Sequence, residues 1–201
     1  MDKAYWDRFA GLYNLFMKKD ESAYREMTAL MQAVVAGKDV LELATGTGKV
    51  TRGISDTART VTATDYSENM LKEARKGGFP ANVVFEQADA AHLPYGDRQF
   101  DVVIIANALH IMPEPETVLR EIDRVLKEDG LLIAPTFTHS ENSKGQTLLS
   151  KLMEKITGFQ TEHDWTRAEY VDFLRENGWE FTRGRTIKAS FPLTYIEAKR
   201  A

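Results

Sequence analysis

The chain has 201 residues, no cysteine and a formal net charge of −4 at pH 7, and its length fits a single domain spanning residues 1–201. Without thiols it can form no disulfide, zinc–thiolate site, iron–sulfur cluster or thiol nucleophile, and we expect a protein of the reducing cytoplasm. A polyanion needs a basic binding face, so the acidic balance argues against nucleic acid as a partner.

The first predicted element is a helix over residues 2–18, where apolar and aromatic residues recur at helical spacing. Packing on the edge of a sheet would explain this pattern. So would a position on a membrane surface, although that needs a basic polar face and only four lysine or arginine residues lie among the first 19. No apolar run approaches the about 18 residues of a spanning helix, and the acidic start is unlike a signal peptide. A second helix is predicted over 22–36.

The chain is organised around residues 40–50, VLELATGTGKV. An apolar run gives way to alternating threonines and glycines and then to helical periodicity through Ala58, which predicts a strand, a tight turn and a helix. Glycine permits a sharp turn and close approach of a ligand, and a helix start attracts an anionic group. The next strand, 60–64, ends at Asp65. An acid about 20 residues past such glycines holds ribose hydroxyls in nucleotide-binding α/β folds.

The turn does not fit the common nucleotide-binding motifs. The third glycine of G-x-G-x-x-G, which allows close packing of helix on strand in dinucleotide-binding folds, is replaced by Thr51 or by Lys49, depending on the alignment. No G-x-x-x-x-G-K-[ST] sequence occurs, which excludes a P-loop. Glu42 places a carboxylate beside the turn, where it would repel a pyrophosphate and tolerate an ammonium group.

Residues 40–50 resemble the first motif of class I S-adenosylmethionine-dependent methyltransferases, an acid followed by G-x-G-x-G. Ala44 stands in place of the first glycine, and we expect a negative φ there, which alanine tolerates. Residues 93–101, LPYGDRQFD, and 121–132, EIDRVLKEDGLL, resemble LPFxDxxFD and E-x-x-R-V-L-K-P-G-G-x-L of the ubiquinone/menaquinone C-methyltransferase-like branch (methyltransferase type 11). The resemblance runs from about Met1 to Phe137.

The rest of the chain continues the alternation of strands and helices. After residue 65 we expect helices over 67–76, 114–127, 143–157 and 166–177 and strands over 82–86, 100–106, 131–137, 179–190 and 191–198. The last two strands should form an antiparallel pair at the sheet edge. The predicted fold is therefore α/β: a Rossmann-like, doubly wound, seven-stranded sheet, mostly parallel with an antiparallel edge strand, and with helices on both faces.

The resemblance implies that S-adenosylmethionine is the cofactor and binds at the carboxyl ends of the strands, where ligands of such sheets lie. Glu42 would orient the ammonium of its methionine moiety, and the backbone of residues 44–46 would line that moiety. The implied contacts are Glu42; the backbone of Ala44, Thr45 and Gly46; Asp65 to the ribose hydroxyls; Tyr66 and Met70 beside the adenine; Asp89 and the Ala90 N–H at the adenine edge; the Asn107 carbonyl at the methionine end; and Tyr13 closing over that end.

Methyl transfer from a sulfonium is an in-line displacement, so the protein mainly aligns the acceptor with the methyl group. A base is needed only if the acceptor must lose a proton. His110, four residues past the strand over 100–106, is the candidate catalytic residue, as a base or as an acceptor contact, and a purely structural role is equally open. We predict no metal, because the four histidines are far apart in sequence and Asn107 is not the carboxylate that metal-dependent O-methyltransferases need.

Two segments flank the core and are expected to reach the carboxyl edge of the sheet: a helical lid over 1–36 and an acceptor-side insertion over 138–165. Long segments of this kind commonly carry specificity. We expect them to enclose the acceptor with Tyr13, Leu148, Leu152, Phe159 and Trp165.

Three functions remain open from the sequence. The first is methyl transfer to a small, partly apolar acceptor. The second is methyl transfer to a membrane-borne acceptor such as an isoprenoid quinone or a phospholipid headgroup, suggested by the aromatic N-terminal helix and the Leu/Met face at 148–156. The third is a non-catalytic regulator that binds S-adenosylmethionine. The sequence leaves the oligomeric state open.

Overall fold

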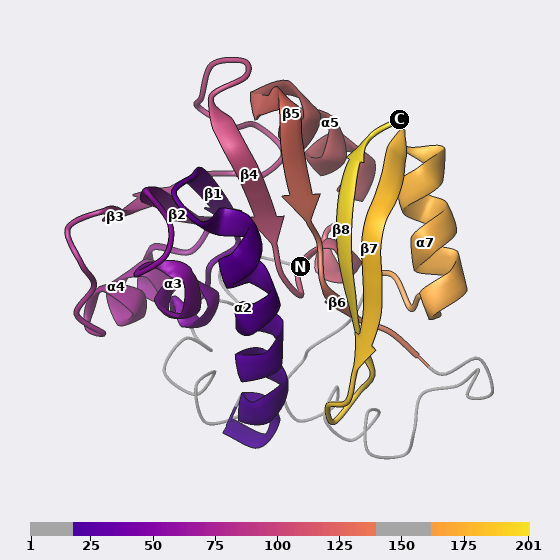
Figure 1. The fold of residues 1–201 in the computed structure, drawn as a ribbon, viewed down its shortest axis with the longest axis horizontal. Helices are drawn as coiled ribbons and strands as arrows, with labels where there is room; N and C mark the ends of the chain where they lie inside the picture. Colours follow the sequence, from indigo (N-terminus) through magenta and orange to yellow (C-terminus); the bar gives the residue numbers. More distant parts are fainter. Residues whose placement is uncertain (1–17, 140–161) are drawn as a thin grey trace.

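The computed structural model describes residues 18–139 and 162–201. These residues form an eight-stranded sheet with the strand order β3-β2-β1-β4-β5-β8-β6, and β7 pairs with β8 (Figure 1). Helices cover both faces, so the predicted doubly wound α/β fold is confirmed. The predicted helices over 2–18 and 143–157 fall outside the described residues, as do Tyr13, Leu148, Leu152 and Phe159.

Most of the predicted elements occur within a few residues of their expected bounds. The helices are α2 (Glu21–Val35), α3 (Lys49–Ile54), α4 (Glu68–Arg75), α5 (Pro115–Val125) and α7 (Arg167–Glu176), with short 3-10 turns η1 (Lys18–Asp20) and η2 (Leu109–Ile111). The strands are β1 (Asp39–Leu43), β2 (Thr60–Asp65), β3 (Val83–Gln87), β4 (Phe100–Ile105), β5 (Leu126–Ile133), β6 (Thr136–Phe137), β7 (Trp179–Ile187) and β8 (Leu193–Arg200).

The parallel part of the sheet consists of β3, β2, β1, β4 and β5. Val40 of β1 lies opposite Val61 of β2 on one side and Val102 of β4 on the other. The chain therefore adds strands outward in one direction from β1 and then in the other, and the order reverses between β1 and β4. The crevice outside the carboxyl ends at such a reversal is where ligands bind in open α/β sheets.

Strands β5 and β6 differ in two ways from the single strand predicted over 131–137. Strand β5 begins at Leu126, inside the predicted helix over 114–127, and its register against β4 shifts before Leu131. Pro135 has no N–H to donate to a ladder and separates β5 from β6, which raises the strand count from the expected seven to eight. The antiparallel pair at the edge, β7 and β8, is confirmed.

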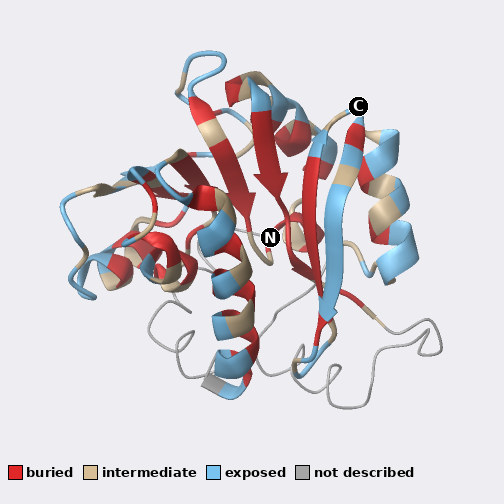
Figure 2. Cartoon of the chain, in the orientation of Figure 1, coloured by how far each residue is buried: buried red, intermediate tan, exposed pale blue. Residues whose placement is uncertain are grey.

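The central strands β1 and β4 are largely buried, as their mostly apolar sequences indicate (Figure 2). Leu41 and Leu43 belong to the core under α5 and α7, whereas Val40 belongs to the core under α2 and α3. The helix ends follow the predicted signals: Ser67 caps α4 by accepting from the Met70 N–H, and Thr166 forms a capping box with Glu169 at the start of α7.

Candidate active site

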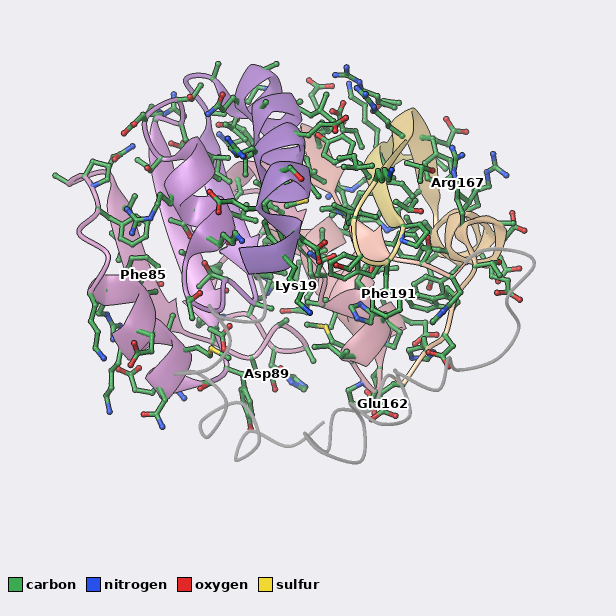
Figure 3. All side chains as sticks on the ribbon, turned by 90° about the horizontal axis from the view of Figure 1, so that it is seen from below. Lys19, Phe85, Asp89, Glu162, Arg167 and Phe191 are labelled. Carbon is green, nitrogen blue, oxygen red and sulfur yellow. The ribbon has the colours of Figure 1, made fainter. Side chains whose placement is uncertain are left out.

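The strand ends singled out in the sequence meet at one edge of the sheet. The Thr45 N–H donates to the Thr64 carbonyl at 2.8 Å, and the Ala88 N–H donates to the Asp65 carbonyl at 3.2 Å. These bonds connect the ends of β1, β2 and β3. Figure 3 views the molecule from this side, and Asp89 lies there between Phe85 of β3 and Glu162 in projection.

The glycine turn after β1 is left-handed at three positions. Gly46 and Gly48 have φ of 56° and 76°, and Ala44 has φ of 52°. Our expectation of a negative φ at Ala44 is therefore wrong. A side chain in this conformation brings Cβ close to the following carbonyl oxygen, at a cost of about 1–2 kcal/mol. The turn imposes this geometry on the alanine that stands at the first glycine position.

Ala44→Gly is expected to increase the free energy of unfolding by up to about 1 kcal/mol, because glycine relieves the left-handed strain but has more freedom to lose on folding. Urea unfolding of the parent and variant would measure this. Ala63→Gly, in the interior of β2, is the matched control and should be destabilised. Equal destabilisation by both substitutions would contradict the strain at Ala44.

Glu42, at the end of β1, is buried and forms a triangle of short contacts with the hydroxyls of Thr45 and Thr51. From the sequence, Thr45 was named only for its backbone, and neither hydroxyl was given a role. The Thr45 and Thr51 hydroxyl oxygens lie 2.9 and 2.6 Å from the two carboxyl oxygens and 2.7 Å from each other. Three hydrogen bonds need three protons, and the two hydroxyls supply two. A protonated Glu42 supplies the third and closes the ring.

The electrostatic surroundings of Glu42 agree with this proton count. Burial raises its pKa from 4.5 to about 7, the hydrogen bonds from Thr51 and Thr45 oppose the rise, and the neighbouring Asp65 charge adds to it. Near neutral pH the ligand-free protein is thus close to balance between a neutral and an ionised Glu42. A cation bound nearby would favour the ionised form.

Asp65, at the end of β2, supports two neighbouring turns. One carboxylate oxygen accepts from the Gly46 N–H and the other from the Ser67 N–H, each at 2.8 Å. The side chain thereby joins the glycine turn to the start of α4. A carboxylate has about four lone-pair sites, so the same group has the capacity to accept from ligand hydroxyls as well.

The residues predicted beside the adenine follow the ends of β2 and β3. Tyr66 is 52% exposed, whereas Met70 is buried in the first turn of α4. The Tyr66 carbonyl accepts from Gln87 Nε2 at 2.9 Å, which connects it to the end of β3. Past that end, Asp89 is followed directly by Ala90, and one Asp89 oxygen accepts from the Ala91 N–H at 2.9 Å. Tyr66, Asp89 and Ala90 therefore follow β2 and β3 at the same edge of the sheet as Asp65.

Asn107, after β4, adds an unsatisfied acceptor. It has φ of 53°, and its N–H donates to the Pro135 carbonyl at 2.8 Å. Its Nδ2 donates to the Tyr24 hydroxyl of α2 at 2.9 Å, a contact between residues distant in sequence that the sequence did not indicate. Asn107 Oδ1 is buried and has no hydrogen-bond partner among the described residues. A buried acceptor without a hydrogen-bond partner is suited to bind a ligand that donates a hydrogen bond to it.

The chemistry of these groups can be tested against S-adenosylmethionine. Asp65 and Asp89 are carboxylates, Glu42 is a buried acid, and Asn107 Oδ1 is an orphaned acceptor. The set suits a ligand that offers hydroxyls, amino groups and positive charge, as S-adenosylmethionine does through its ribose, its adenine and ammonium groups and its sulfonium. It does not suit a pyrophosphate. The residues present fit the group that the sequence resemblance implied.

His110 lies past Asn107, in η2, and is buried. Its Nδ1 is 2.9 Å from the hydroxyl oxygen of Thr136 in β6, and its carbonyl accepts from the Glu162 and His163 N–H groups. Burial lowers its pKa from 6.5 to about 4; the charge of Asp164 opposes this shift, and His139 and His163 add to it. His110 is therefore neutral at pH 7.

The fold gathers three histidines that are far apart in sequence. His139 Nε2 lies 3.4 Å from an Asp164 oxygen, and His163 stacks on Trp165 with ring centroids 4.7 Å apart. The Trp165 ring stacks in turn on Phe173 of α7. Within residues 18–139 and 162–201, no group of three or more His, Cys, Asp or Glu side chains is placed to hold a metal ion. The absence of a metal remains a prediction.

Comparison with known sequences gives one family match and many relatives. The "Methyltransferase domain" family matches residues 41–134. A ubiquinone/menaquinone biosynthesis C-methyltransferase of Bdellovibrio bacteriovorus is 28% identical over 86% of this chain and 82% of its own length. An uncharacterised methyltransferase of Arabidopsis thaliana is 31% identical over 80% of this chain and 48% of its own. A demethylmenaquinone methyltransferase of Clavibacter sepedonicus is 36% identical over 59% and 49%. The chain spans about half the length of the last two relatives.

Solved structures of methyltransferases share the fold across the whole chain. DhpI in complex with SAH is 26% identical, with a TM-score of 0.76 over 99% of this chain and 95% of its own. A methyltransferase of Haloferax volcanii, solved with the activator Trm112, has a TM-score of 0.78 over 97% of both chains. At 20% identity, this similarity shows only that the two chains share a fold. The similarity thus extends beyond the region matched by the domain family.

Proposed function

Because the chain belongs to the class I S-adenosylmethionine-dependent methyltransferases, we propose that it transfers the methyl group of S-adenosylmethionine to a small, partly apolar acceptor. The observation that carries this proposal is the convergence of Glu42, Asp65, Asp89 and the orphaned Asn107 oxygen on one sheet edge. A set made almost entirely of acceptors complements a cationic ligand rich in donors.

Each of these residues has a role in holding the cofactor. Asp65 binds the ribose hydroxyls while it keeps the glycine turn in place. Asp89 and the Ala90 N–H select the adenine edge, beside Tyr66 and Met70. Glu42 attracts the methionine ammonium, and the backbone of residues 44–46 lines that moiety. Bound S-adenosylmethionine supplies an electrophilic methyl group on a good leaving group. The residues of this chain therefore bind, align and exclude water, and alignment can supply about 7–11 kcal/mol.

The acceptor side is formed by the elements past β4. His110 and Trp165 provide a polar group and an apolar surface there. The lid over 1–36 and the insertion over 138–165 are proposed to complete the enclosure. Most of the residues that would do so, Tyr13 among them, lie outside the described part.

A membrane-borne acceptor is the second candidate, favoured by the named activities of the relatives in ubiquinone and menaquinone biosynthesis. Peripheral contact with a membrane would then bring the protein to its substrate. Within the described residues, no helix is both long enough and apolar enough to cross a membrane. Sedimentation with vesicles of anionic phospholipid distinguishes the two candidates. An enzyme for a membrane-borne acceptor should sediment with the vesicles, and an enzyme for a water-soluble acceptor should stay in the supernatant.

The proposal is tested by incubating the protein with methyl-labelled S-adenosylmethionine and either an aqueous metabolite extract or a lipid extract dispersed in detergent. Label should appear in a new product, together with S-adenosylhomocysteine, and Asp65→Ala should strongly reduce it at subsaturating cofactor. Saturable binding without any S-adenosylhomocysteine formation in either extract would favour a non-catalytic regulator.

Turnover of the acceptor found in this screen is expected to survive a chelator, because cofactor and acceptor can be aligned by protein groups alone. The measurement is the initial rate with and without excess EDTA, after dialysis against the chelator. A rate that falls to background and returns with magnesium would overturn the prediction of a metal-independent enzyme.

A further inference from the structure

The connection from β3 to β4 has the form of a loop, although a crossover between parallel strands usually contains a helix. Residues 88–99, which the structure describes in full, form turns and one isolated bridge, between Asp89 and His92. Backbone N–H and C=O groups outside helices and strands still need hydrogen-bond partners where they pack on the core. Part of this loop therefore has to find its partners on another element.

Two side chains of α5 supply those partners. Glu121 accepts from the Leu93 N–H at 2.7 Å. Arg124 donates to the Leu93 and Tyr95 carbonyls at 3.1 and 2.6 Å. It also reaches the Asp97 carboxylate, with 3.1 Å between Nη1 and Oδ1. The loop is thus bound to α5 through both N–H and C=O groups of its backbone.

The two α5 side chains hold each other in the orientation that these bonds need. Arg124 Nε and Nη2 donate to the two Glu121 oxygens at 2.9 and 2.8 Å, a bidentate pair that fixes the plane of the guanidinium. The hydrogen bond from Arg124 lowers the pKa of Glu121, burial opposes this shift, and the Leu93 N–H supports it. Glu121 is therefore an ionised acceptor at neutral pH.

These bonds join the two stretches that resemble motifs of the methyltransferase branch. The bonded loop residues belong to 93–101, LPYGDRQFD, and the two α5 side chains belong to 121–132, EIDRVLKEDGLL. Neither stretch contains a cofactor contact proposed above. Their role has to be sought in what the bound loop carries.

The loop carries Asp89, and the bonds to α5 begin directly after the turn that orients this residue. The Asp89 carbonyl accepts from the His92 N–H at 3.0 Å, and the next N–H, that of Leu93, is the one bonded to Glu121. Before the turn, the Ala88 N–H is bonded to the end of β2. The turn is thus fixed at both ends, while the Asp89 side chain remains 50% exposed on the side shown in Figure 3.

We propose that Arg124 and Glu121 are positioning residues for adenine recognition. They hold the turn over 89–92 so that the Asp89 carboxylate and the Ala90 N–H meet the edge of the base together. This rests on the proposed cofactor function. Adenine offers an amino donor and a ring-nitrogen acceptor, which complement a carboxylate and an N–H. Hypoxanthine offers the reverse pattern, an oxygen acceptor and a ring N–H donor, and a rigid site of this kind rejects it.

The test compares S-adenosylhomocysteine with S-inosylhomocysteine, which differs only at this edge of the base, by titration calorimetry on the full-length chain. The parent should prefer S-adenosylhomocysteine by about 10- to 150-fold, the value of one hydrogen bond to a charged group. Arg124→Met removes every donor of the guanidinium and should lower this preference by about 10-fold. A variant that is merely less stable has fewer competent sites, but the ratio of its two dissociation constants stays that of the parent.

Arg120→Met is the matched control on the same helix. Arg120 is exposed and donates to Thr117 of α5 at 2.9 Å, so its loss should leave the preference for S-adenosylhomocysteine unchanged. Arg124→Lys keeps the charge but cannot hold several acceptors at once, and it should show a partial loss. If Arg124→Met does not fold by circular dichroism, Arg124→Lys provides the same test.

The second positioning residue is tested by a pair of variants. Glu121→Gln keeps a side-chain oxygen that can accept from the Leu93 N–H, and it should retain most of the preference. Glu121→Ala has no such oxygen and should lose the preference. Equal preference in these two variants would contradict a role of this hydrogen bond in holding the loop.

Three results would count against the inference, and they are distinguishable. A folded Arg124 variant with the preference of the parent, or an equal loss in Arg120→Met, would overturn the positioning role alone. A parent that binds both compounds equally would show that Asp89 does not read the base, and this would overturn the role while leaving the cofactor site. A parent that binds neither compound would refute the proposed cofactor function itself.

Discussion

Asp65→Ala is expected to weaken S-adenosylhomocysteine binding by about 10- to 150-fold, corresponding to the about 1.5–3 kcal/mol of hydrogen bonds to a charged group. The substitution removes the proposed ribose contact. It also removes the acceptor for the Gly46 and Ser67 N–H groups, so the glycine turn loses its support from β2. Binding should therefore suffer both from the lost contact and from a less ordered turn.

Two further variants make the Asp65 result specific. Asp65→Asn keeps one oxygen acceptor and should bind with intermediate affinity. Asp56→Ala removes an exposed acid between α3 and β2 and should bind like the parent. Titration calorimetry at fixed salt measures all three. An Asp65→Ala variant that binds within twofold of the parent would show that the ribose site has been placed wrongly.

Glu42→Gln is expected to make the ligand-free protein more stable at pH 8 by roughly 2–4 kcal/mol, with little difference at pH 4.5. The pKa of Glu42 is about 7 in the folded protein, against an ordinary 4.5. Between these values the folded state binds more protons than the unfolded state, so the free energy of unfolding falls as pH rises through that window. Glutamine carries no charge, and its N–H can supply the third hydrogen of the ring with Thr45 and Thr51.

Urea unfolding of parent and variant across pH 4.5 to 8 measures this difference, which should increase with pH and level off above about 7. Glu116→Gln, an exposed acid on α5, is the matched control and should show a flat difference. The same Glu42→Gln variant should bind S-adenosylmethionine more weakly, since it lacks the charge that attracts the ammonium. A pH-independent stability difference would mean that folding does not raise the pKa of Glu42.

The architecture could be predicted because hydrophobic periodicity and strand-end chemistry are local signals. The central strands contain short, mostly apolar runs, and the polar or glycine residues that follow them, such as Gly46, Asp65 and Asn107, come to one edge in the fold. The position of Asp65 relative to the glycine turn followed from the same alternation. Pro135 is visible in the sequence as a residue without an N–H, yet the strand predicted over 131–137 runs across it, whereas the structure divides the strand there.

The local geometry of the site could not be predicted in the same way. Ala44 was expected to have a negative φ, because a single residue type does not reveal that the surrounding turn imposes a left-handed conformation. The threonines around Glu42 became significant only when the first helical turn of α3 brought Thr51 back over β1. These details depend on packing between elements rather than on the pattern within one.

Contacts between distant segments were the least predictable. Tyr24 meets Asn107 across the sheet edge, and Thr136 meets His110, because helix α2 and strand β6 are placed by the whole fold. The sequence showed four separate histidines, whereas the fold gathers three of them near Asp164. The packing of helices, strands and loops in the complete fold decides which of these side chains become neighbours.

The central claim is that this sheet edge binds S-adenosylmethionine rather than a dinucleotide. Titration calorimetry of the full-length protein with S-adenosylhomocysteine, and separately with NAD⁺, tests it most directly. We predict saturable binding of S-adenosylhomocysteine at one site per chain and no heat of binding for NAD⁺. Saturable binding of NAD⁺ with none of S-adenosylhomocysteine would contradict the assignment of the site.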